Sequence, residues 1–285
     1  MTVLVTGTSG HLGRLTVLAL LERGVPAGEI VATARDLDKI ADLADLGVQT
    51  RRADYTDPDS LDAAFAGVDR AVLVSSNAVG SRVDDHRNVV DAAARAGVGL
   101  LGYTSILRAD TSDLLLAADH RETEDLIKAS GVPFTFLRNG WYLENYTENT
   151  APALATGQVV GSAGDGRVSA AARADFAAAA AAVLAGGEHA GAVYELAGDE
   201  AFTMAEYAAA LGSATGQEIG YTDLPVDEYA GILTSAGVPA GFAQVLADSD
   251  RGIAAGALED RSGDLSRLIG RPTTPLADAL RGIGS

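Results

Sequence analysis

Over its first 138 residues the chain alternates short apolar, β-branched runs with longer amphipathic stretches, many of them rich in alanine. The runs expected to form strands are residues 3–6, 30–34, 48–53, 71–74, 100–104 and 134–137. The stretches expected to form helices include 12–23, 60–66, 88–96 and 115–129. Strands that alternate with helices are joined by right-handed crossovers and lie parallel in one sheet. The pattern therefore predicts an α/β fold with a doubly wound, Rossmann-type parallel sheet.

The alternation becomes irregular in the second half of the chain, where glycine turns multiply. The alanine run at 177–182 predicts an ordinary buried helix, because Val183 continues an apolar face and Asp175 is a plausible N-terminal cap. We expect a first unit over residues 1–150 and a smaller α/β lobe over residues 151–285. The prediction includes the alternative that segments late in the chain add to the first sheet.

The overall composition excludes several classes of function. Acidic residues outnumber basic ones by 39 to 21, and a net charge of −18 repels the phosphates of nucleic acids. There are no cysteines and the four histidines are scattered, so no metal site is expected. Residues 1–6 already form a predicted strand, and no uncharged run reaches the roughly 18 residues of a membrane span. We expect a cytoplasmic protein that binds neither nucleic acid nor membrane.

A glycine motif follows the first predicted strand directly and opens the first predicted helix. In such a motif one glycine permits the tight turn, one lets a pyrophosphate approach the backbone, and one lets helix and strand pack closely. Free amides at the helix N-terminus would then face the phosphates. The residues of this predicted phosphate loop are Gly7, Thr8, Ser9, Gly10, His11, Leu12 and Gly13. The competing interpretation is a purely structural glycine turn.

The residue at the tip of the second strand indicates which dinucleotide is bound. Enzymes that use NAD carry an acidic residue about 20 residues after the motif, where it binds the ribose 2′-hydroxyl. Here Arg35 occupies that place, and a guanidinium suits the 2′-phosphate of NADPH. Asp36 follows at once and would weaken the preference. The alternative is that Arg35 is only a solvated residue at a strand end.

Polar residues at the ends of the next strands are expected to continue the cofactor site, because ligands of open parallel sheets bind at the carboxyl edge. Asp54 and Tyr55 are expected near the adenine, although Asp54 could equally be a turn residue. The remaining residues assigned to the path toward the nicotinamide are Ser75, Ser76, Asn77 and Thr104.

Seven segments spread along nearly the whole chain match a known family pattern, namely 53–55, 86–90, 103–105, 137–142, 193–199, 247–250 and 268–274. Together they resemble the NmrA-like, atypical short-chain dehydrogenase family. The resemblance is closest to its quinone-reducing bacterial branch, with the branch that reduces triphenylmethane dyes next. The resemblance implies an enzyme that prefers NADPH and uses neither flavin nor metal. The family's cofactor residues fall on the glycine motif, Arg35, residues 75–77, Arg173 and the run Asn139, Gly140, Trp141, Tyr142, Leu143 and Glu144.

The proton relay of ordinary short-chain dehydrogenases is missing. Aligned on the 115–129 helix, the position of the relay tyrosine holds Leu116 and that of the lysine holds His120. Reduction of an ordinary ketone would leave an alkoxide unprotonated, whereas a quinone gives a much less basic phenolate. His120 is the candidate that orients the acceptor or donates a proton, because a histidine pKa can lie near neutrality. The alternative is a merely solvated histidine.

The remaining catalytic candidates lie where the sixth strand ends. We expect Asn139 to hold the nicotinamide carboxamide, while Trp141 and Tyr142 offer flat surfaces to the ring or the acceptor. The competing interpretation is that Trp141 only packs between the two lobes.

These observations predict an NADPH-dependent reductase that passes hydride directly to a small, quinone-like acceptor. Residues 1–150 would be the NADP-binding domain and residues 151–285 the substrate-binding lobe. Two alternatives stay open, a non-catalytic regulator that senses NADP(H) and a reductase of triphenylmethane-type dyes. A homodimer is the assembly that we allow for.

Overall fold

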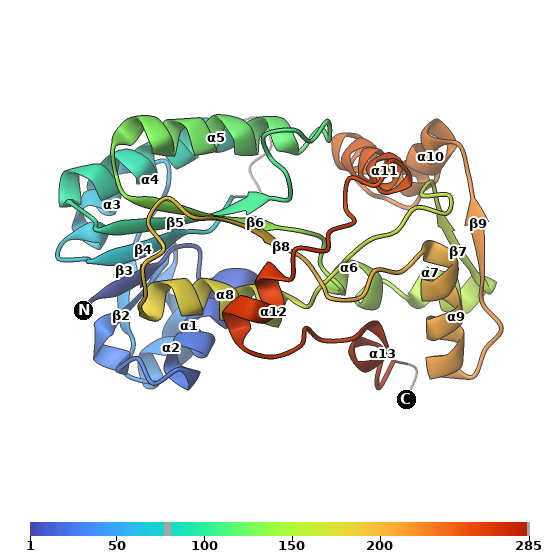
Figure 1. Cartoon of the computed structure of the whole chain (residues 1–285), viewed down its shortest axis with the longest axis horizontal. Helices are drawn as coiled ribbons and strands as arrows, with labels where there is room; N and C mark the ends of the chain where they lie inside the picture. Colours follow the sequence, from blue (N-terminus) through green and yellow to red (C-terminus); the bar gives the residue numbers. More distant parts are fainter. Residues whose placement is uncertain (77–80, 284–285) are drawn as a thin grey trace.

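The computed structural model describes residues 1–76 and 81–283. Its centre is a parallel sheet of seven strands in the order β3-β2-β1-β4-β5-β6-β8 (Figure 1). The strands are β1 (Val3–Val5), β2 (Ile30–Ala34), β3 (Gln49–Arg52), β4 (Arg70–Leu73), β5 (Leu100–Ile106), β6 (Phe134–Asn139) and β8 (Val193–Leu196). Helices lie on both faces, so the predicted doubly wound, Rossmann-type α/β fold is confirmed.

Two layers of helices cover the sheet, and local sequence signals fix several of their ends. One layer contains α3 (Pro58–Phe65), α4 (Arg82–Ala96) and α5 (Ala117–Ser130), and the other contains α1 (His11–Glu22), α2 (Ala41–Asp45), α8 (Arg173–Ala185) and α12 (Asp264–Ile269) (Figure 1). Two 3-10 helices, η1 (Ala27–Glu29) and η2 (Leu37–Ile40), flank β2. Asp57 caps α3 by accepting the Ser60 amide, and α4 ends at Gly97, which adopts the left-handed conformation that favours glycine.

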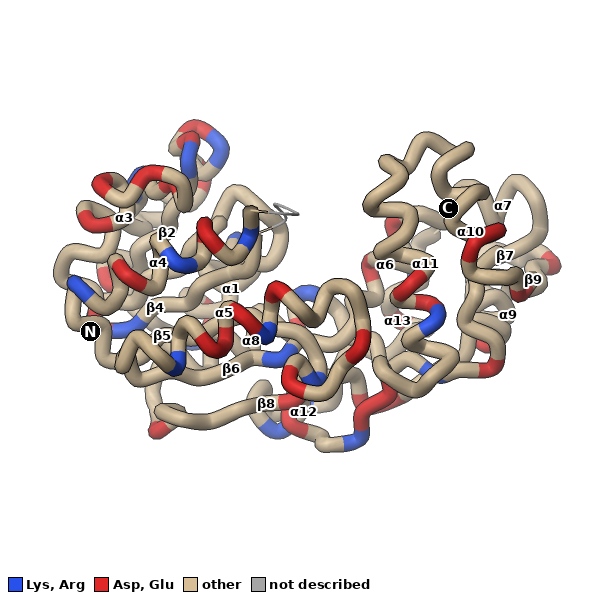
Figure 2. Tube along the Cα trace, turned by 90° about the horizontal axis from the view of Figure 1, so that it is seen from above, with Lys and Arg blue, Asp and Glu red and all other residues tan. Residues whose placement is uncertain are grey.

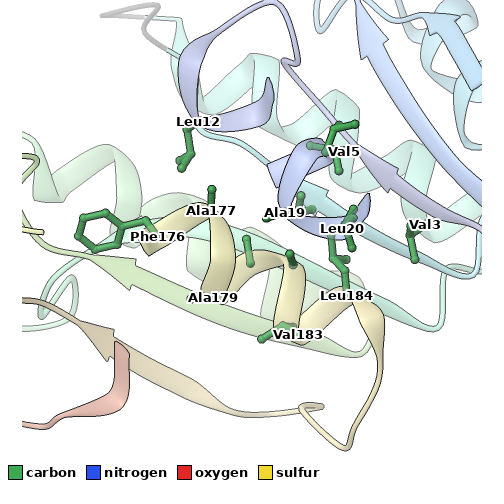
Figure 3. Packing of buried hydrophobic residues seen from close by; sticks show 14 of the residues in the cluster. Val3, Val5, Leu12, Ala19, Leu20, Phe176, Ala177, Ala179, Val183 and Leu184 are labelled. Atoms are coloured by element: carbon green, nitrogen blue, oxygen red, sulfur yellow. The ribbon is translucent and has the colours of Figure 1, made fainter. Parts of the chain in front are cut away.

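The alanine run forms one side of a close helix pair. Ala177 and Leu184 of α8 lie beside α1, which contributes Leu12 and Leu20 to the same apolar cluster (Figure 3). Small side chains let the two helix backbones approach, so this helix is buried as predicted. Asp175 does not cap it, contrary to our prediction. Its carboxylate instead accepts the Thr274 amide at 2.7 Å and so ties α8 to the C-terminal segment.

The second half of the chain divides between the main sheet and a smaller lobe. Strand β8 pairs with β6 at the edge of the sheet, and α8 and α12 pack below it (Figure 1). The smaller lobe contains a two-stranded parallel sheet of β7 (Gln158–Gly161) and β9 (Gly220–Asp223). Its helices are α6 (Glu144–Thr147), α7 (Ala151–Thr156), α9 (Met204–Thr215), α10 (Val226–Ser235), α11 (Ala240–Ala254) and α13 (Leu276–Ala279). Figure 2 shows this lobe on one side and the large sheet on the other.

Two central strands extend further than the sequence pattern predicts, by two residues each. β5 continues to Ile106 and β6 to Asn139, and these two residues pair in register. The extension matters because it carries polar residues of both strands to the same edge of the sheet. Among the described residues, no helix is long and apolar enough to cross a membrane, and no group of acidic or imidazole side chains is arranged to hold a metal.

A buried ionic cluster lies beneath these strand ends. Arg138 is 5% exposed and Glu124 is 1% exposed, and the guanidinium bonds both carboxylate oxygens at 2.9 and 2.7 Å. Ser105 donates to the same carboxylate at 2.7 Å, and Glu195 accepts from Arg138 at 2.9 Å. The cluster therefore joins β5, β6, β8 and α5, and its central pair, Arg138 and Glu124, has little access to water.

Replacing Glu124 by alanine should strongly destabilise the protein, because Arg138 would keep a buried charge without its main partner. We expect a loss of about 3–5 kcal/mol in the free energy of unfolding, measured by urea denaturation. The matched control is Asp62→Ala, whose partner Arg95 is half exposed, with an expected loss of about 0–1 kcal/mol. Equal small losses in both variants would contradict this account.

Candidate functional site

A cavity of about 650 Å³ lies along the carboxyl edge of the main sheet. One end of the cavity lies where the chain leaves β1. The strand order reverses at β1, with β2 and β3 on one side and β4, β5, β6 and β8 on the other. Residues expected from the sequence that line it are Gly7, Ser9, Gly10, His11, Leu12, Gly13, Arg35, Asp54, Tyr55, Ser75, Ser76, Thr104, His120, Asn139, Gly140, Trp141, Tyr142 and Arg173. The structure thus brings both ends of the predicted site into one continuous space.

The glycine loop has the shape that its spacing predicts. Gly7 has a φ of +62°, and the Gly10 amide donates to the Gly7 carbonyl at 3.0 Å to close the turn before α1. A Cβ on Gly13 would lie 2.6 Å from the Gly7 carbonyl oxygen, so only glycine lets the helix sit this close. Thr8 does not line the cavity, because its hydroxyl donates to the Thr33 carbonyl at 3.0 Å and its side chain is buried.

Arg35 stands at the end of β2 with its guanidinium unengaged. It is exposed and makes no hydrogen bond or ion pair to the part of the chain that the structure describes. Asp36 does not neutralise it, because the Asp36 carboxylate caps η2 by accepting the Asp38 amide at 3.1 Å. Asp85 also lines the cavity, where burial and the nearby Asp54 raise the pKa of its carboxyl while Arg35 lowers it. An anion entering this end would therefore meet an available cation.

The adenine-side candidates are held by local hydrogen bonds. The Asp54 carboxylate accepts the amide and the hydroxyl of Thr56 at 3.0 and 2.9 Å, so it also has the turn role that we kept as an alternative. The Tyr55 hydroxyl donates to the Val74 carbonyl at 2.9 Å, and burial raises the pKa of this phenol. These contacts fix the wall of the cavity between β3 and β4.

Two polar atoms on the cavity wall lack partners. The Ser75 hydroxyl and the Asn139 side-chain oxygen are buried and make no hydrogen bond. Buried polar groups are nearly always satisfied in folded proteins, so such atoms on a cavity wall suit the polar groups of a ligand. Thr104 accepts the Ser75 amide at 2.8 Å and so holds β4 against β5 at this point. Asn77 lies outside the described residues.

The segment after β6 serves two purposes. Trp141 lines the cavity and also packs against the apolar core of the smaller lobe, so the two interpretations that we weighed are compatible. Tyr142 packs edge-on against Phe176, and Arg173 lies over its ring at 5.3 Å. Both residues line the cavity beside the glycine loop.

Two expected ligand residues in the same segment do not line the cavity. Leu143 is buried, and its amide donates to the Ala171 carbonyl at 2.9 Å. The Glu144 carboxylate accepts the Arg173 amide at 2.9 and 3.1 Å, which caps the N-terminus of α8. Glu144 therefore does locally what we had expected of Asp175, and it positions α8 for the site.

His120 is a wall residue rather than a solvated one. It is 8% exposed, and its Nδ1 lies 2.8 Å from the Tyr103 hydroxyl. Burial lowers the pKa of its imidazole to about 3, with Arg82 and His86 acting in the same direction. Our expectation of a pKa near neutrality is wrong, because desolvation disfavours the imidazolium. At neutral pH this side chain is an uncharged imidazole.

Sequence reasoning missed several wall residues. The additional lining residues are Ala34, Ala53, Thr56, Val74, Asp85, Ser105, Ile106, Leu116 and Asn145, although Leu116 had been noted as the site of the absent tyrosine. Ser105 and Ile106 were missed because β5 runs two residues beyond its predicted end. Alignment of strand ends at one sheet edge would have found them. Together with Leu116 and Trp141, Ile106 gives this end of the cavity an apolar surface.

This fold and this site define a dinucleotide-binding protein of the Rossmann type. A family described as NAD(P)H-binding matches residues 7–186, and the chain belongs to that family. It is 47% identical over 278 residues to quinone oxidoreductase 2 of Escherichia coli K12, an alignment that covers 98% of this chain and 97% of that protein. The resemblance expected from the sequence is thereby confirmed.

Two solved structures extend the comparison. The Escherichia coli NADPH-dependent quinone oxidoreductase complexed with NADPH has a TM-score of 0.95 at 46% identity, with 98% of each chain covered. The Citrobacter triphenylmethane reductase complexed with NADP(H) has a TM-score of 0.93 at 36% identity, covering 98% of this chain and 99% of that one. The likeness therefore includes the smaller lobe as well as the dinucleotide-binding half.

The buried state of His120 predicts how stability depends on pH. The folded pKa is lowered to about 3, so below pH 6.5 the unfolded chain takes up a proton that the folded protein cannot. Between pH 7 and 5 the wild type should therefore lose about 2 kcal/mol of unfolding free energy relative to a His120→Gln variant. Urea titrations at each pH measure this difference, and His11→Gln, at an exposed histidine, is the matched control. Parallel curves for wild type and His120→Gln would contradict burial of a neutral ring.

Proposed function

We propose that this protein is an NADPH-dependent reductase that transfers hydride directly to a small quinone-like acceptor, without flavin or metal. The observation that carries the proposal is the single cavity that joins the glycine loop and Arg35 to an apolar wall around Ile106 and Trp141. One end suits an anionic dinucleotide and the other suits a flat, uncharged ring. The Escherichia coli relative, an NADPH-dependent quinone oxidoreductase, supports the same assignment.

The residues present fit the cofactor. Gly10 lines the cavity without a side chain, a Cβ there would also lie only 3.3 Å from the Gly7 carbonyl oxygen, and Arg35 would receive the 2′-phosphate. Ser75 and Asn139 would satisfy their unpaired atoms on the nicotinamide side, with Asn139 holding the carboxamide. When bound, NADPH supplies the hydride. The chain's own residues position the two reactants and exclude water.

The wall around the acceptor favours a quinone over an aliphatic ketone. Leu116 and His120 occupy the places of the tyrosine and lysine that protonate an alkoxide in related enzymes, and His120 carries no charge at neutral pH. A quinone needs less help, because its reduced oxygen is a weakly basic phenolate. Holding the two reactants at reacting distance can by itself lower the barrier by several kcal/mol, and we propose that the apolar wall around Ile106 and Trp141 contributes this.

We assign different roles to the aromatic residues of the site. Tyr142 is held by Phe176 and Arg173, so we propose that it supports the cofactor side of the cavity. Trp141 lies beside the smaller lobe and is proposed to offer its flat face to the acceptor. His120 is proposed to orient the acceptor oxygen.

The setting of the protein is also a proposal. We propose that it works in the cytoplasm on a small molecule and does not bind nucleic acid, an interpretation supported by the net charge of −18 and by acidic residues spread over both halves (Figure 2). We further propose that residues 1–150, apart from α6 in the smaller lobe, form the NADP-binding domain together with the returning segments α8, β8 and α12. The rest of residues 151–285 would form the substrate-binding lobe, and the homodimer stays a hypothesis.

Reversing the charge of Arg35 tests the cofactor preference. Arg35→Asp should raise the Kd for NADPH by about 10- to 100-fold, because a charged hydrogen bond contributes roughly 1.5–3 kcal/mol. Fluorescence titration with NADPH and with NADH measures the effect, and NADH affinity should not fall. The matched control is Arg87→Asp, the same charge change on an exposed face of α4 away from the cavity lining. Unchanged NADPH affinity in Arg35→Asp would remove the assignment.

Turnover distinguishes the reductase from the regulator. Anaerobic NADPH consumption is measured with benzoquinones, naphthoquinones and triphenylmethane dyes, and we expect the quinones to have the highest kcat/KM. Preference for the dyes would move the protein to the dye-reducing alternative. Tight NADPH binding with no turnover of any acceptor would favour the sensing regulator instead.

A further inference from the structure

A row of hydrogen-bonded side chains lies behind the acceptor end of the cavity. It consists of His86 and Thr123 on one side and Tyr103 and His120 on the other. The His86 ring stands edge-on to the Tyr103 ring, with centroids 5.5 Å apart. All four residues are buried, with exposures from 0 to 8%. The direction of each hydrogen bond in this row therefore has consequences for the site.

The proton positions on the His86 side follow from the donors present. The Ser76 amide lies 3.0 Å from His86 Nε2 and can only donate, so Nε2 accepts. The ring is uncharged because burial lowers the pKa of His86 to about 3, so its proton is on Nδ1 and is donated to Thr123 Oγ1 at 3.0 Å. The Thr123 hydroxyl in turn donates to the Asp119 carbonyl at 2.9 Å. Thr123 consequently has no proton left for Tyr103.

The same reasoning assigns the tautomer of His120. The Tyr103 hydroxyl is buried, and its phenolic proton needs an acceptor, since an unmade hydrogen bond at such a site is costly. Thr123 and Ser75 also lie near this phenol, but Thr123 Oγ1 accepts from His86 and the Ser75 hydroxyl makes no hydrogen bond of normal geometry. Nδ1 of His120, at 2.8 Å, is the acceptor in hydrogen-bonding position. Tyr103 therefore donates to Nδ1, and the ring proton of His120 is on Nε2.

This arrangement leaves a hydrogen-bond donor at the cavity. His120 belongs to the cavity wall, together with Ile106 and Leu116, and Nε2 has no hydrogen-bond partner among the described residues. An uncharged N–H in an apolar wall suits a carbonyl oxygen on which negative charge develops. A lone pair at the same place would repel that charge.

We propose that Tyr103 is a positioning residue that fixes His120 as the Nε2–H tautomer, so that His120 donates a hydrogen bond to the carbonyl oxygen of the acceptor. The proposal rests on the proposed function and adds to it the group that recognises the acceptor oxygen. His120 keeps its proton throughout. The reduced acceptor gains one hydride from NADPH as a phenolate and takes one proton from water as it leaves the site, which balances the reaction.

The tautomer is measured directly by long-range 1H–15N NMR of protein labelled at its four histidines. The signals of His120 are assigned by their loss in His120→Gln. We expect Nε2–H in the wild type and a shift toward Nδ1–H in Tyr103→Phe, which removes the donated proton with almost no change of shape. A wild-type His120 protonated on Nδ1 would overturn the proposal, and this reading does not require the variant to fold.

Kinetics test the consequence for the acceptor. Tyr103→Phe should lower kcat/KM for a quinone by about tenfold, because a fraction of the protein molecules would lose the Nε2–H donor of His120. The Kd for NADPH should stay within twofold. The matched control is Tyr194→Phe, because Tyr194 makes the same 2.8 Å contact with Nδ1 of His189 away from the cavity lining. This control should alter the His189 signals and leave quinone kinetics unchanged. An unchanged kcat/KM in Tyr103→Phe would contradict the proposal.

The outcomes separate this inference from the function on which it rests. A wild type that reduces no quinone would remove the proposed function and the acceptor role of His120 together. Turnover by a wild type with His120 protonated on Nδ1 would leave the reductase intact and remove the donor role of His120 together with the role of Tyr103. Turnover by a fully active Tyr103→Phe would remove the role of Tyr103 alone.

Discussion

The close approach of α1 to the loop that follows β1 is the contact on which the rest of the site depends. Gly13 lies so near the Gly7 carbonyl that a methyl group cannot be accommodated, and this closeness aims the free amides of the helix into the cavity. Leu12 and Leu20 of α1 are buried in the same apolar cluster as residues of α8. A helix held by both the β1 loop and α8 gives the phosphates a rigid place to bind.

Local periodicity and glycine spacing were sufficient to predict the main sheet, because both signals are contained within short stretches of sequence. The glycine motif and Arg35 were located for the same reason, since each occupies a fixed place relative to one strand. The comparisons extend this agreement to both lobes, as relatives that match nearly the whole chain share the fold. The cofactor end of the site was therefore the more predictable part.

What sequence reasoning missed depends on contacts between distant segments. Asp175 has a suitable position for a cap, but its carboxylate bonds Thr274, almost one hundred residues away, and Glu144 caps the helix instead. The ionisation of His120 was misjudged because desolvation depends on what surrounds the ring rather than on its neighbours in sequence. The Thr8 side chain is buried instead of facing the cavity because its hydroxyl donates to the Thr33 carbonyl. Such outcomes need the tertiary structure.

The late return of β8 has a consequence for how the chain reaches its native state. Until residues 193–196 have been synthesised, β6 has an open edge, and until residues 173–185 have been synthesised the apolar face of α1 lacks its partner α8. Unpaired strand edges and uncovered helix faces promote association with other chains. The nascent first half is thus an incomplete folding unit, and cooperative assembly of the sheet awaits a segment made well after the nucleotide-binding loop.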